Sequence, residues 1–357
     1  MQVLFPIYLL LSVILILFSY NNMLRGKNVN YFLSVVMMFI YIAFVYNRPF
    51  NHPGDTETYL YIFNYISNNH SYASFRVEKG FLILLDVISE ITHDNRSFLF
   101  IITIINSSLW FFCFRYWLGN KRLALAVLTF ISLFCSYNLG ANVLRQGLAI
   151  PLILIAIKLL DNRKFIFSFI FILISISFHQ SSLILLFSYL ISLLDIKVKG
   201  YIIFFFVLSL LSYLGVFQHI SNVLSVSFSS YSHILSDNSF ENYHVGFRVD
   251  FWLYTSLILV LYFLLNEDSK EKYSKLIKIY IINFSVFIVM FDIPYSDRVG
   301  VYCWSLYPFV LASFLGGYKY KIMNNELVYI FLISIMGSLS FLFYPVMNLG
   351  WNLDSII

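Results

Sequence analysis

Apolar runs of about 15–22 residues recur from one end of this 357-residue chain to the other, and short polar clusters separate them. A helix needs about 20 apolar residues to cross the roughly 30 Å hydrocarbon core of a bilayer. The runs lack the apolar–polar alternation that membrane-spanning strands require, so we expect helices. With 60% hydrophobic and 11% charged residues, the chain cannot form a water-facing surface of ordinary polarity. The sequence therefore predicts an all-α polytopic integral membrane protein.

The apolar runs predict about twelve transmembrane helices, with a range of 10–14, in a single transmembrane domain over residues 1–357. The expected spans are residues 3–20, 30–46, 97–118, 123–139, 147–160, 165–178, 181–194, 201–217, 249–265, 276–291, 299–315 and 327–345. Residues 80–91 form a shorter run that carries Asp86 and Glu90 at helical spacing. We expect an interfacial or re-entrant helix there and not a span.

Every second loop is rich in lysine and arginine, and this pattern indicates the orientation of the chain in the membrane. If alternate loops face the cytoplasm, most of the 23 Lys and Arg residues lie on that side, and the outer side holds only Arg48, Arg76, Lys79, Arg96, Arg145, Arg248 and Arg298. The large loops, about 47–96 and 218–248, then fall on the outer face, where Asp, Glu, His, Tyr and Asn gather. We therefore expect function at the outer face.

The three cysteines, Cys113, Cys135 and Cys303, lie inside apolar runs without C-x-x-C spacing or a nearby histidine. They are typical of small hydrophobic residues in a core. The chain also lacks a P-loop, a G-x-S-x-G motif and a nucleotide-binding fingerprint. We expect no metal, no cofactor and no cytoplasmic nucleotide sugar as donor.

Arg145 is the most informative charged residue, because it sits between two hydrophobic runs. A guanidinium at membrane depth is costly and is usually retained because it pairs or faces a polar cavity, although near a helix end it can also extend to the interface. Asn142 and Gln146 flank it, and Gly140 and Gly147 allow close approach of neighbouring groups. This setting favours a polar cavity with a functional role.

Two carboxylates stand where outer helices are expected to begin. Asp55 follows a Pro-Gly turn signal and precedes an aromatic-rich segment that contains Tyr59. Glu78 precedes Lys79 and Gly80 at the start of the expected interfacial helix. Each carboxylate has a structural alternative, since acidic residues often cap or stabilise a helix N-terminus. The sequence leaves both readings open.

His179 and Arg298 are two further polar residues at outer helix ends. His179 lies in a short break between apolar runs, where it is either hydrogen-bonded to neighbouring backbone or available as a general base. Arg298 opens a later helix, and its structural alternative is an ion pair with Asp292 or Asp297. Together with the residues above, they place two arginines, a histidine and two carboxylates at one mouth of a helical bundle. Such a set suits a lipid diphosphate, because the guanidinium fork binds phosphate while a carboxylate or imidazole takes a proton.

Five motifs follow one another in order between about residues 45 and 310, namely Gly54-Asp55-x-x-x-Tyr59, Glu78-x-Gly80-Phe81, Leu144-Arg145-Gln146-Gly147-Leu148-Ala149, Phe178-His179-x-Ser181-Ser182-Leu183 and Arg298-x-x-x-Tyr302. Each motif alone is weak, but the ordered set resembles the EpsG family of Wzy-type polysaccharide polymerases. The outer loops are more modest than the wide, charged loops of that pattern.

The resemblance implies a glycosyltransferase in the bacterial inner (cytoplasmic) membrane, with its active site facing the periplasm or outside. It would join oligosaccharide repeat units carried on undecaprenyl diphosphate, in O-antigen or in capsule or exopolysaccharide synthesis. Its partners would be these lipid-linked oligosaccharides, membrane lipid and, as a candidate, a chain-length regulator protein, with no nucleic acid.

Joining the residues to the resemblance gives a site hypothesis. Arg145 and Arg298 bind the diphosphate leaving group, and His179, Asp55 or Glu78 accepts the proton of the attacking hydroxyl. The substrate-binding candidates are Gln146, Asn142, Tyr59 and Tyr302.

The alternative function is a lipid-linked oligosaccharide flippase or another secondary transporter. A transporter typically places ionisable residues near the middle of the membrane on broken helices, often within internal repeats. Here they are expected at outer helix ends, and no repeat is visible. This difference favours the enzyme.

Overall fold

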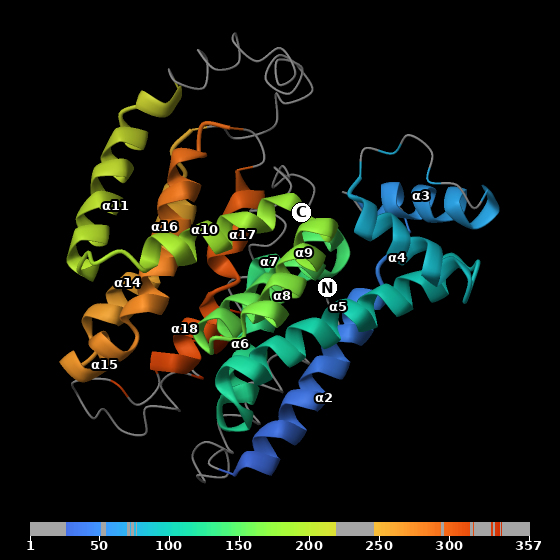
Figure 1. Ribbon diagram of the computed structural model, residues 1–357, viewed down its shortest axis with the longest axis horizontal. Coiled ribbons are helices and arrows are strands. Elements are labelled where there is room, and N and C mark those ends of the chain that lie inside the picture. Colours follow the sequence, from blue (N-terminus) through green and yellow to red (C-terminus); the bar gives the residue numbers. More distant parts are fainter. Residues whose placement is uncertain are drawn as a thin grey trace, which may run out of the picture. The chain divides into compact units, whose positions relative to one another are not determined.

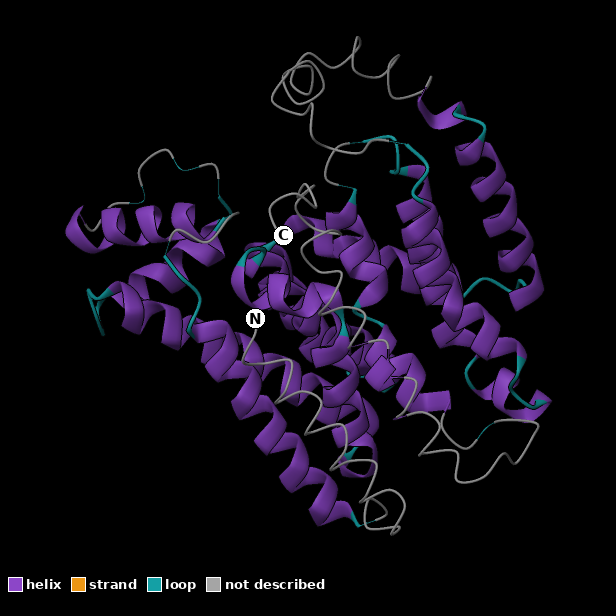
Figure 2. Ribbon diagram, turned by 180° about the vertical axis from the view of Figure 1, so that it is seen from behind, coloured by secondary structure: helices purple, strands orange, loops and turns teal. Residues whose placement is uncertain are grey.

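The computed structural model describes residues 26–50, 55–69, 72, 75, 77–218, 246–293, 296–314, 317, 330, 333–335 and 337. All regular elements in these ranges are helices, and no strand occurs among them (Figure 1, Figure 2). The all-helical class is thereby confirmed for the described part of the chain. The expected span at 3–20 and most of the span at 327–345 and of the loop at 218–248 lie outside the described residues.

The chain divides into two compact units, and the first comprises Met1–Leu186 and Met323–Ser338. Its main described helices are α2 (Lys27–Tyr46), α3 (Thr56–Asn69), α4 (Lys79–Ser89), α5 (Asn95–Leu118), α6 (Leu123–Ser132), α7 (Phe134–Ala141), α8 (Leu144–Asp161) and α9 (Phe165–Phe178). Within this unit α8 packs against α5 and α9, and α2 packs against α5 and α6. Cys113 and Cys135 are free and buried here, as predicted.

The second unit comprises Phe187–Ile322 and Leu339–Ile357. Its described helices are most of α10 (Leu183–Ser192), then α11 (Val198–Tyr213), α14 (Val249–Phe263), α15 (Glu267–Lys272), α16 (Ser274–Val289), α17 (Asp297–Trp304) and α18 (Tyr307–Phe314). Aromatic contacts hold it together: Phe205 packs against Trp252 and Phe284, and the buried Trp304 packs against Phe251.

Two described helices, α2 and α5, are long and apolar enough to cross a membrane. A third span results if α6 and α7, with the short turn before them, count as one. Shorter apolar helices occur at Phe165–Phe178, Gln180–Ser192, Val198–Tyr213 and Val249–Phe263. The expected number of about twelve spans stays a prediction.

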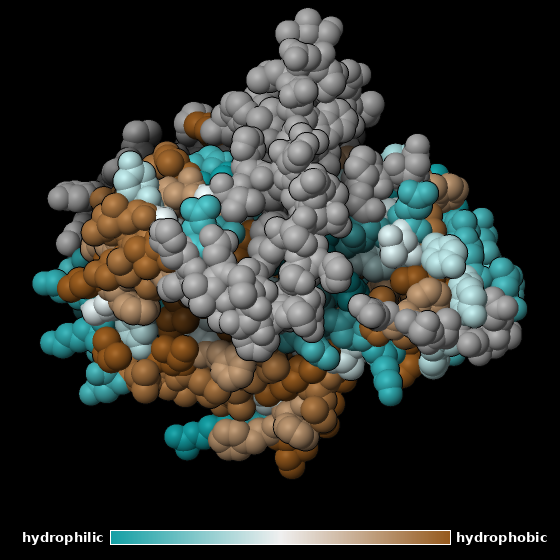
Figure 3. Space-filling view, turned by 90° about the horizontal axis from the view of Figure 1, so that it is seen from above, coloured by the Kyte–Doolittle hydropathy of each residue, from teal (hydrophilic) through white to brown (hydrophobic). Residues whose placement is uncertain are grey.

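Large apolar side chains are exposed along α9 and α11, among them Ile166, Phe169 and Phe204. Figure 3 shows extensive hydrophobic surface on the face that it displays. Water-soluble proteins rarely expose contiguous apolar patches of this kind. The exposed apolar side chains and the apolar helices together describe a membrane protein.

The span expected at 123–139 is not one continuous helix, because α6 and α7 meet at an 84° bend. Leu133 between them has an extended backbone, with φ −73° and ψ 132°. Serine hydroxyls bind carbonyls on either side of the break: Ser132 Oγ donates to the Leu128 carbonyl and Ser136 Oγ to the Leu133 carbonyl. Such side-chain bonds compete with regular helix geometry and often accompany bends.

The span expected at 299–315 is likewise divided into α17 and α18. Pro308, the second residue of α18, has no backbone N–H and therefore cannot continue the hydrogen bonding of α17. Ser305 Oγ, just after α17, donates to the Val301 carbonyl. A proline at a helix start explains the break.

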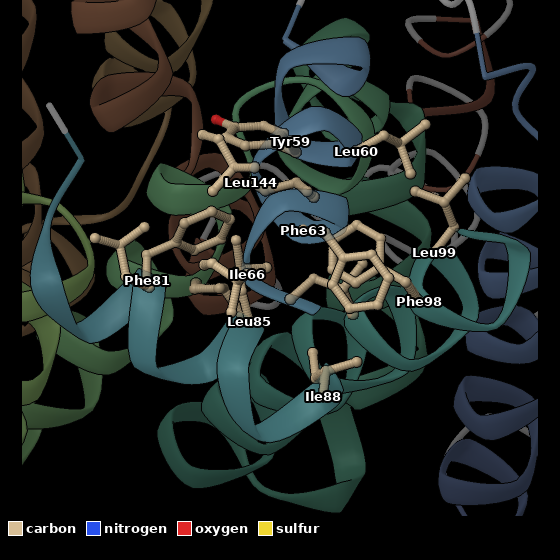
Figure 4. Packing of buried hydrophobic residues seen from close by; sticks show 14 residues of the cluster. Tyr59, Leu60, Phe63, Ile66, Phe81, Leu85, Ile88, Phe98, Leu99 and Leu144 are labelled. Atoms are coloured by element: carbon tan, nitrogen blue, oxygen red, sulfur yellow. The ribbon is translucent and has the colours of Figure 1, made fainter. Parts of the chain in front are cut away.

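The extra helix expected at 80–91 is observed as α4, Lys79–Ser89. Figure 4 shows how its buried face packs: Phe81, Leu85 and Ile88 lie against side chains of α3 and α5. The opposite face leaves Ile83 exposed. This amphipathic division agrees with the expected helix, and its position at a membrane interface stays a prediction.

Candidate functional site

Glu78 lies just before α4 and does not cap that helix with its side chain. Only its backbone carbonyl joins the helix, accepting from the N–H groups of Phe81 and Leu82. The carboxylate instead binds residues far away in the sequence, namely Arg145, His179 and, at 3.4 Å, the backbone N–H of Gln180. Arg145 Nη1 donates to Oε2 at 2.5 Å, and His179 Nδ1 lies 2.8 Å from Oε1. The Glu78 side chain therefore makes no capping hydrogen bond to α4, and favourable placement of its charge near the helix N-terminus stays an alternative.

The pairing of α8 and α9 explains why Arg145 and His179 meet. Two serines of α9 donate to carbonyls of α8: Ser168 Oγ to Ala156 and, further along α9, Ser175 Oγ to Ala149. The serine with the higher residue number in α9 binds the carbonyl with the lower residue number in α8, so the two helices are antiparallel. The end of α9, where His179 follows, is thereby brought back to the first turn of α8, where Arg145 stands.

Gly80 brings Glu78 to this pair of helices. A Cβ atom at Gly80 would lie 2.2 Å from Ser177 Oγ and 2.7 Å from the Ser177 carbonyl oxygen, so only glycine fits this approach of α4 to α9. Glu78 lies two residues before Gly80, and His179 lies two residues after Ser177. The close contact thus places the carboxylate beside the imidazole.

The environment of Glu78 keeps its carboxylate ionised. Burial raises the pKa, but hydrogen bonds from His179 and Arg145 and the charge of Arg145 outweigh it and lower the pKa of Glu78 to about 2. An ionised carboxylate only accepts hydrogen bonds, so His179 must donate through Nδ1. Its Nε2 has no hydrogen-bond partner among the described residues, and 21% of the side chain is exposed. Nε2 is therefore the atom that can exchange a proton with a substrate.

Arg145 is held from two sides. In addition to its bond to Glu78, it hydrogen-bonds with the side chain of Tyr59, which is buried. Its Nε is buried and finds no partner in the part of the chain that the structure describes. The pairing of Tyr59 with Arg145 was not predicted, since an aromatic residue near a membrane surface gives no signal of a specific hydrogen bond.

Asn142 fixes the junction between α7 and α8. Its Nδ2 donates to Asn138 Oδ1 at 2.9 Å, and its Oδ1 accepts from Thr56 Oγ1 at 3.4 Å. Thr56 also donates to the Ala141 carbonyl at 3.0 Å. Gln146, the other predicted amide, is buried. Asn142 thus holds the chain that leads into Arg145.

The remaining predicted residues are Asp55, Arg298 and Tyr302. Asp55 precedes α3, and its backbone carbonyl accepts from Tyr59 N–H. Arg298 and Tyr302 belong to the second unit, where Arg298 is exposed and Tyr302 is buried in α17. Their proximity to the Glu78 cluster stays a prediction. Among the described residues, no group of three or more His, Cys, Asp or Glu side chains is arranged to hold a metal ion.

Comparisons with known proteins add one finding. The model of the EpsG family matches residues 31–352, nearly the whole chain. Curated proteins and solved structures gave no match. The family is associated with Wzy-type polymerases, in agreement with the resemblance noted from the five motifs. Because the match covers nearly the whole chain, the chain belongs to the EpsG family.

Proposed function

We propose that this protein is a Wzy-type repeat-unit polymerase, a glycosyltransferase that joins undecaprenyl-diphosphate-linked oligosaccharides at the outer face of the bacterial inner membrane, in O-antigen or in capsule or exopolysaccharide synthesis. Membership of the EpsG family supports a polysaccharide polymerase-like membrane protein. The observation that carries the proposal further is the carboxylate of Glu78, which binds Arg145 and His179 together.

The reaction needs one bond to form and one to break. The hydroxyl oxygen of the incoming repeat unit attacks the anomeric carbon at the lipid-linked end of the growing chain. The bond from that carbon to the diphosphate oxygen breaks, and the diphosphate leaves with the electron pair. The hydroxyl proton must pass to a base, and the charge of the leaving group must be neutralised.

The geometry favours His179 as that base over Glu78. Glu78, with a pKa of about 2, is too weak a base for a sugar hydroxyl at neutral pH. Asp55 stays an alternative base. His179 donates Nδ1 to Glu78, which fixes the ring and leaves Nε2 to accept the proton. Glu78 is then a positioning residue.

Arg145 supplies positive charge beside that base. Its Nη1 is engaged with Glu78, and its other N–H groups are the candidates for binding diphosphate oxygens. Arg298 is the second proposed phosphate ligand, and the lysine and arginine distribution supports the outward orientation. A chain-length regulator protein is the proposed protein partner.

The test is the length distribution of surface polysaccharide in a deletion strain complemented with wild type, Arg145→Ala or His179→Ala, with membrane levels of each protein measured. We expect the ladder to collapse to a single repeat unit in both variants at normal protein level. Full-length ladders in the variants would remove these residues from the site. Lipid-linked units that accumulate at the inner face of the deletion strain would instead support the flippase.

A further inference from the structure

Arg48 follows α2 by two residues and is almost completely buried, with 2% of its surface exposed. Its Nη1 donates to the Val45 carbonyl at 3.0 Å and to Thr103 Oγ1 at 3.4 Å. Its Nε and Nη2 are also buried, and neither has a hydrogen-bond partner among the described residues. No carboxylate in the described ranges forms an ion pair with it. A buried guanidinium thus keeps two of its nitrogens without an acceptor.

The charges around Arg48 do not compensate it. The pKa of Arg48 is lowered to about 10, with burial as the largest influence; the nearby positive charge of Arg96 also lowers it, while the phenols of Tyr137 and Tyr41 raise it. A pKa of about 10 still leaves the guanidinium charged at neutral pH. A buried charge that lacks a counter-charge is strongly unfavourable. An anion is the ligand that would remove this penalty.

Arg96 adds a second cation to the same corner. Its Nη1 donates to the carbonyls of Tyr46 and Arg48, at 3.2 and 3.0 Å, and its guanidinium lies 4.4 Å from the ring centre of Phe50. The carboxylate nearest to it in sequence is Asp94, which Arg96 influences electrostatically. That carboxylate accepts from Ser97 N–H and Oγ at the start of α5. The corner therefore carries two arginines and one carboxylate that is already hydrogen-bonded.

A structural role explains only part of this arrangement. Positive side chains are favourable near the C-terminus of a helix, and both arginines donate to carbonyls at the end of α2. For Arg48 this contact uses Nη1 alone. Nε and Nη2 carry the parallel N–H groups of the guanidinium fork, which match two oxygens of a phosphate.

We propose that Arg48 binds a phosphate group through Nε and Nη2, and that the ligand is the diphosphate of a lipid-linked substrate. The inference that the ligand is an anion rests on the two buried nitrogens of Arg48 that have no partner within the described ranges. Its identification as a lipid-linked diphosphate rests on the proposed function. Arg48 lies near Tyr137 of α7, and Arg145 stands in the first turn of α8, directly after α7. The first unit then holds two phosphate-binding arginines, of which the sequence pattern singles out only Arg145.

The test measures binding to the purified full-length protein in detergent, without an acceptor and without turnover. The probes are undecaprenyl diphosphate and inorganic pyrophosphate, with chloride at matched ionic strength. An Arg145→Ala background removes the other phosphate-binding arginine of the first unit. In that background we expect Arg48→Lys to weaken binding of undecaprenyl diphosphate at least tenfold, because lysine keeps the charge but loses the fork. The control is Arg115→Lys, since Arg115 is exposed and binds Asn120; it should leave binding unchanged.

Equal affinities with and without Arg48→Lys would overturn the proposal. If that variant does not fold, the Arg145→Ala protein still decides: a rise in its Tm with either probe supports an anion site other than Arg145, and no rise with both probes overturns the proposal. Stabilisation by pyrophosphate as well as by the lipid shows that the diphosphate suffices, whereas stabilisation by the lipid alone shows that the lipid chain is needed. Arg48-dependent binding in a protein that fails the polysaccharide-ladder test would refute the polymerase and leave the anion site standing.

Discussion

His179 and Glu78 are 101 residues apart in the sequence, and their side chains are joined by a 2.8 Å contact between Nδ1 and Oε1. The other oxygen of the same carboxylate binds Arg145. One acidic side chain thus connects the start of α4, the first turn of α8 and the end of α9.

Replacing Glu78 with glutamine tests its positioning role. The glutamine side chain keeps the size of the glutamate but loses the charge that orients the imidazole and pairs with Arg145. We expect polymerisation in membranes to fall by about 10²-fold or more, since loss of an orienting carboxylate can cost that much in other catalytic sites. The measurement is the initial rate of polymer formation, normalised to the amount of protein. A Glu78→Gln rate within about twofold of wild type would contradict the role.

The pairing of Glu78 also predicts how stability depends on pH. Its pKa is lowered from 4.5 to about 2, so the stabilisation is fully present above pH 4.5 and is lost as the pH falls towards 2. We expect the difference in Tm between wild type and Glu78→Gln to stay constant from pH 7 to about pH 5 and to narrow below that. The measurement is the Tm of wild type and of Glu78→Gln in detergent at pH 7, 5, 4 and 3. The same difference at pH 3 as at pH 7 would argue against the lowered pKa.

Arg145→Lys separates charge from geometry. Lysine keeps the positive charge but not the planar set of N–H groups that contacts Glu78, Tyr59 and the proposed diphosphate. We expect activity to fall by about 10²-fold at unchanged protein level. Arg115→Lys provides the matched control, because Arg115 is exposed at the end of α5 and should tolerate the change. Full activity of Arg145→Lys would exclude the fork as the basis of its role.

Gly80→Ala tests the contact that brings α4 to α9. The added Cβ would meet both the side chain and the backbone of Ser177, so the helices must move apart. We expect a loss of stability of about 1–3 kcal/mol and a weaker Glu78–His179 contact. Ile83→Ala in the same helix is the control, since Ile83 is half exposed. Thermal unfolding of both variants decides, and equal Tm values for Gly80→Ala and wild type would show that the close approach is not required.

The helices of this protein follow closely from its apolar runs, because helix length and burial depend on local composition. The expected run at 165–178 is helical over the same residues. The bend at Leu133 and the break before Pro308 were not predicted, because the apolar pattern continues through both. The positions of these turns depend on serine hydroxyls and on the missing backbone N–H of Pro308. A hydrophobicity pattern contains no information about either.

The candidate site was predicted as separate residues and not as an arrangement. The sequence points to Glu78, Arg145 and His179 because each polar side chain stands at an expected outer helix end in a very apolar chain. Their shared bonds depend on the antiparallel packing of α8 and α9 and on Gly80, neither of which sequence spacing reveals. The sequence does not distinguish Arg48, because an arginine just beyond an apolar run normally reaches the interface; only its burial in the structure sets it apart.

Because one oxygen of Glu78 binds Arg145 and the other binds His179, these two contacts are not independent. A phosphate that drew Arg145 away from the carboxylate would leave that negative charge to the groups at the other oxygen, the imidazole of His179 and the backbone N–H of Gln180. Linkage requires the reverse as well, so that a stronger contact between the imidazole and the carboxylate would ease the release of Arg145 towards an anion. Binding of the diphosphate to Arg145 and the contact that positions His179 would then be coupled through the Glu78 side chain, without any movement of the helices.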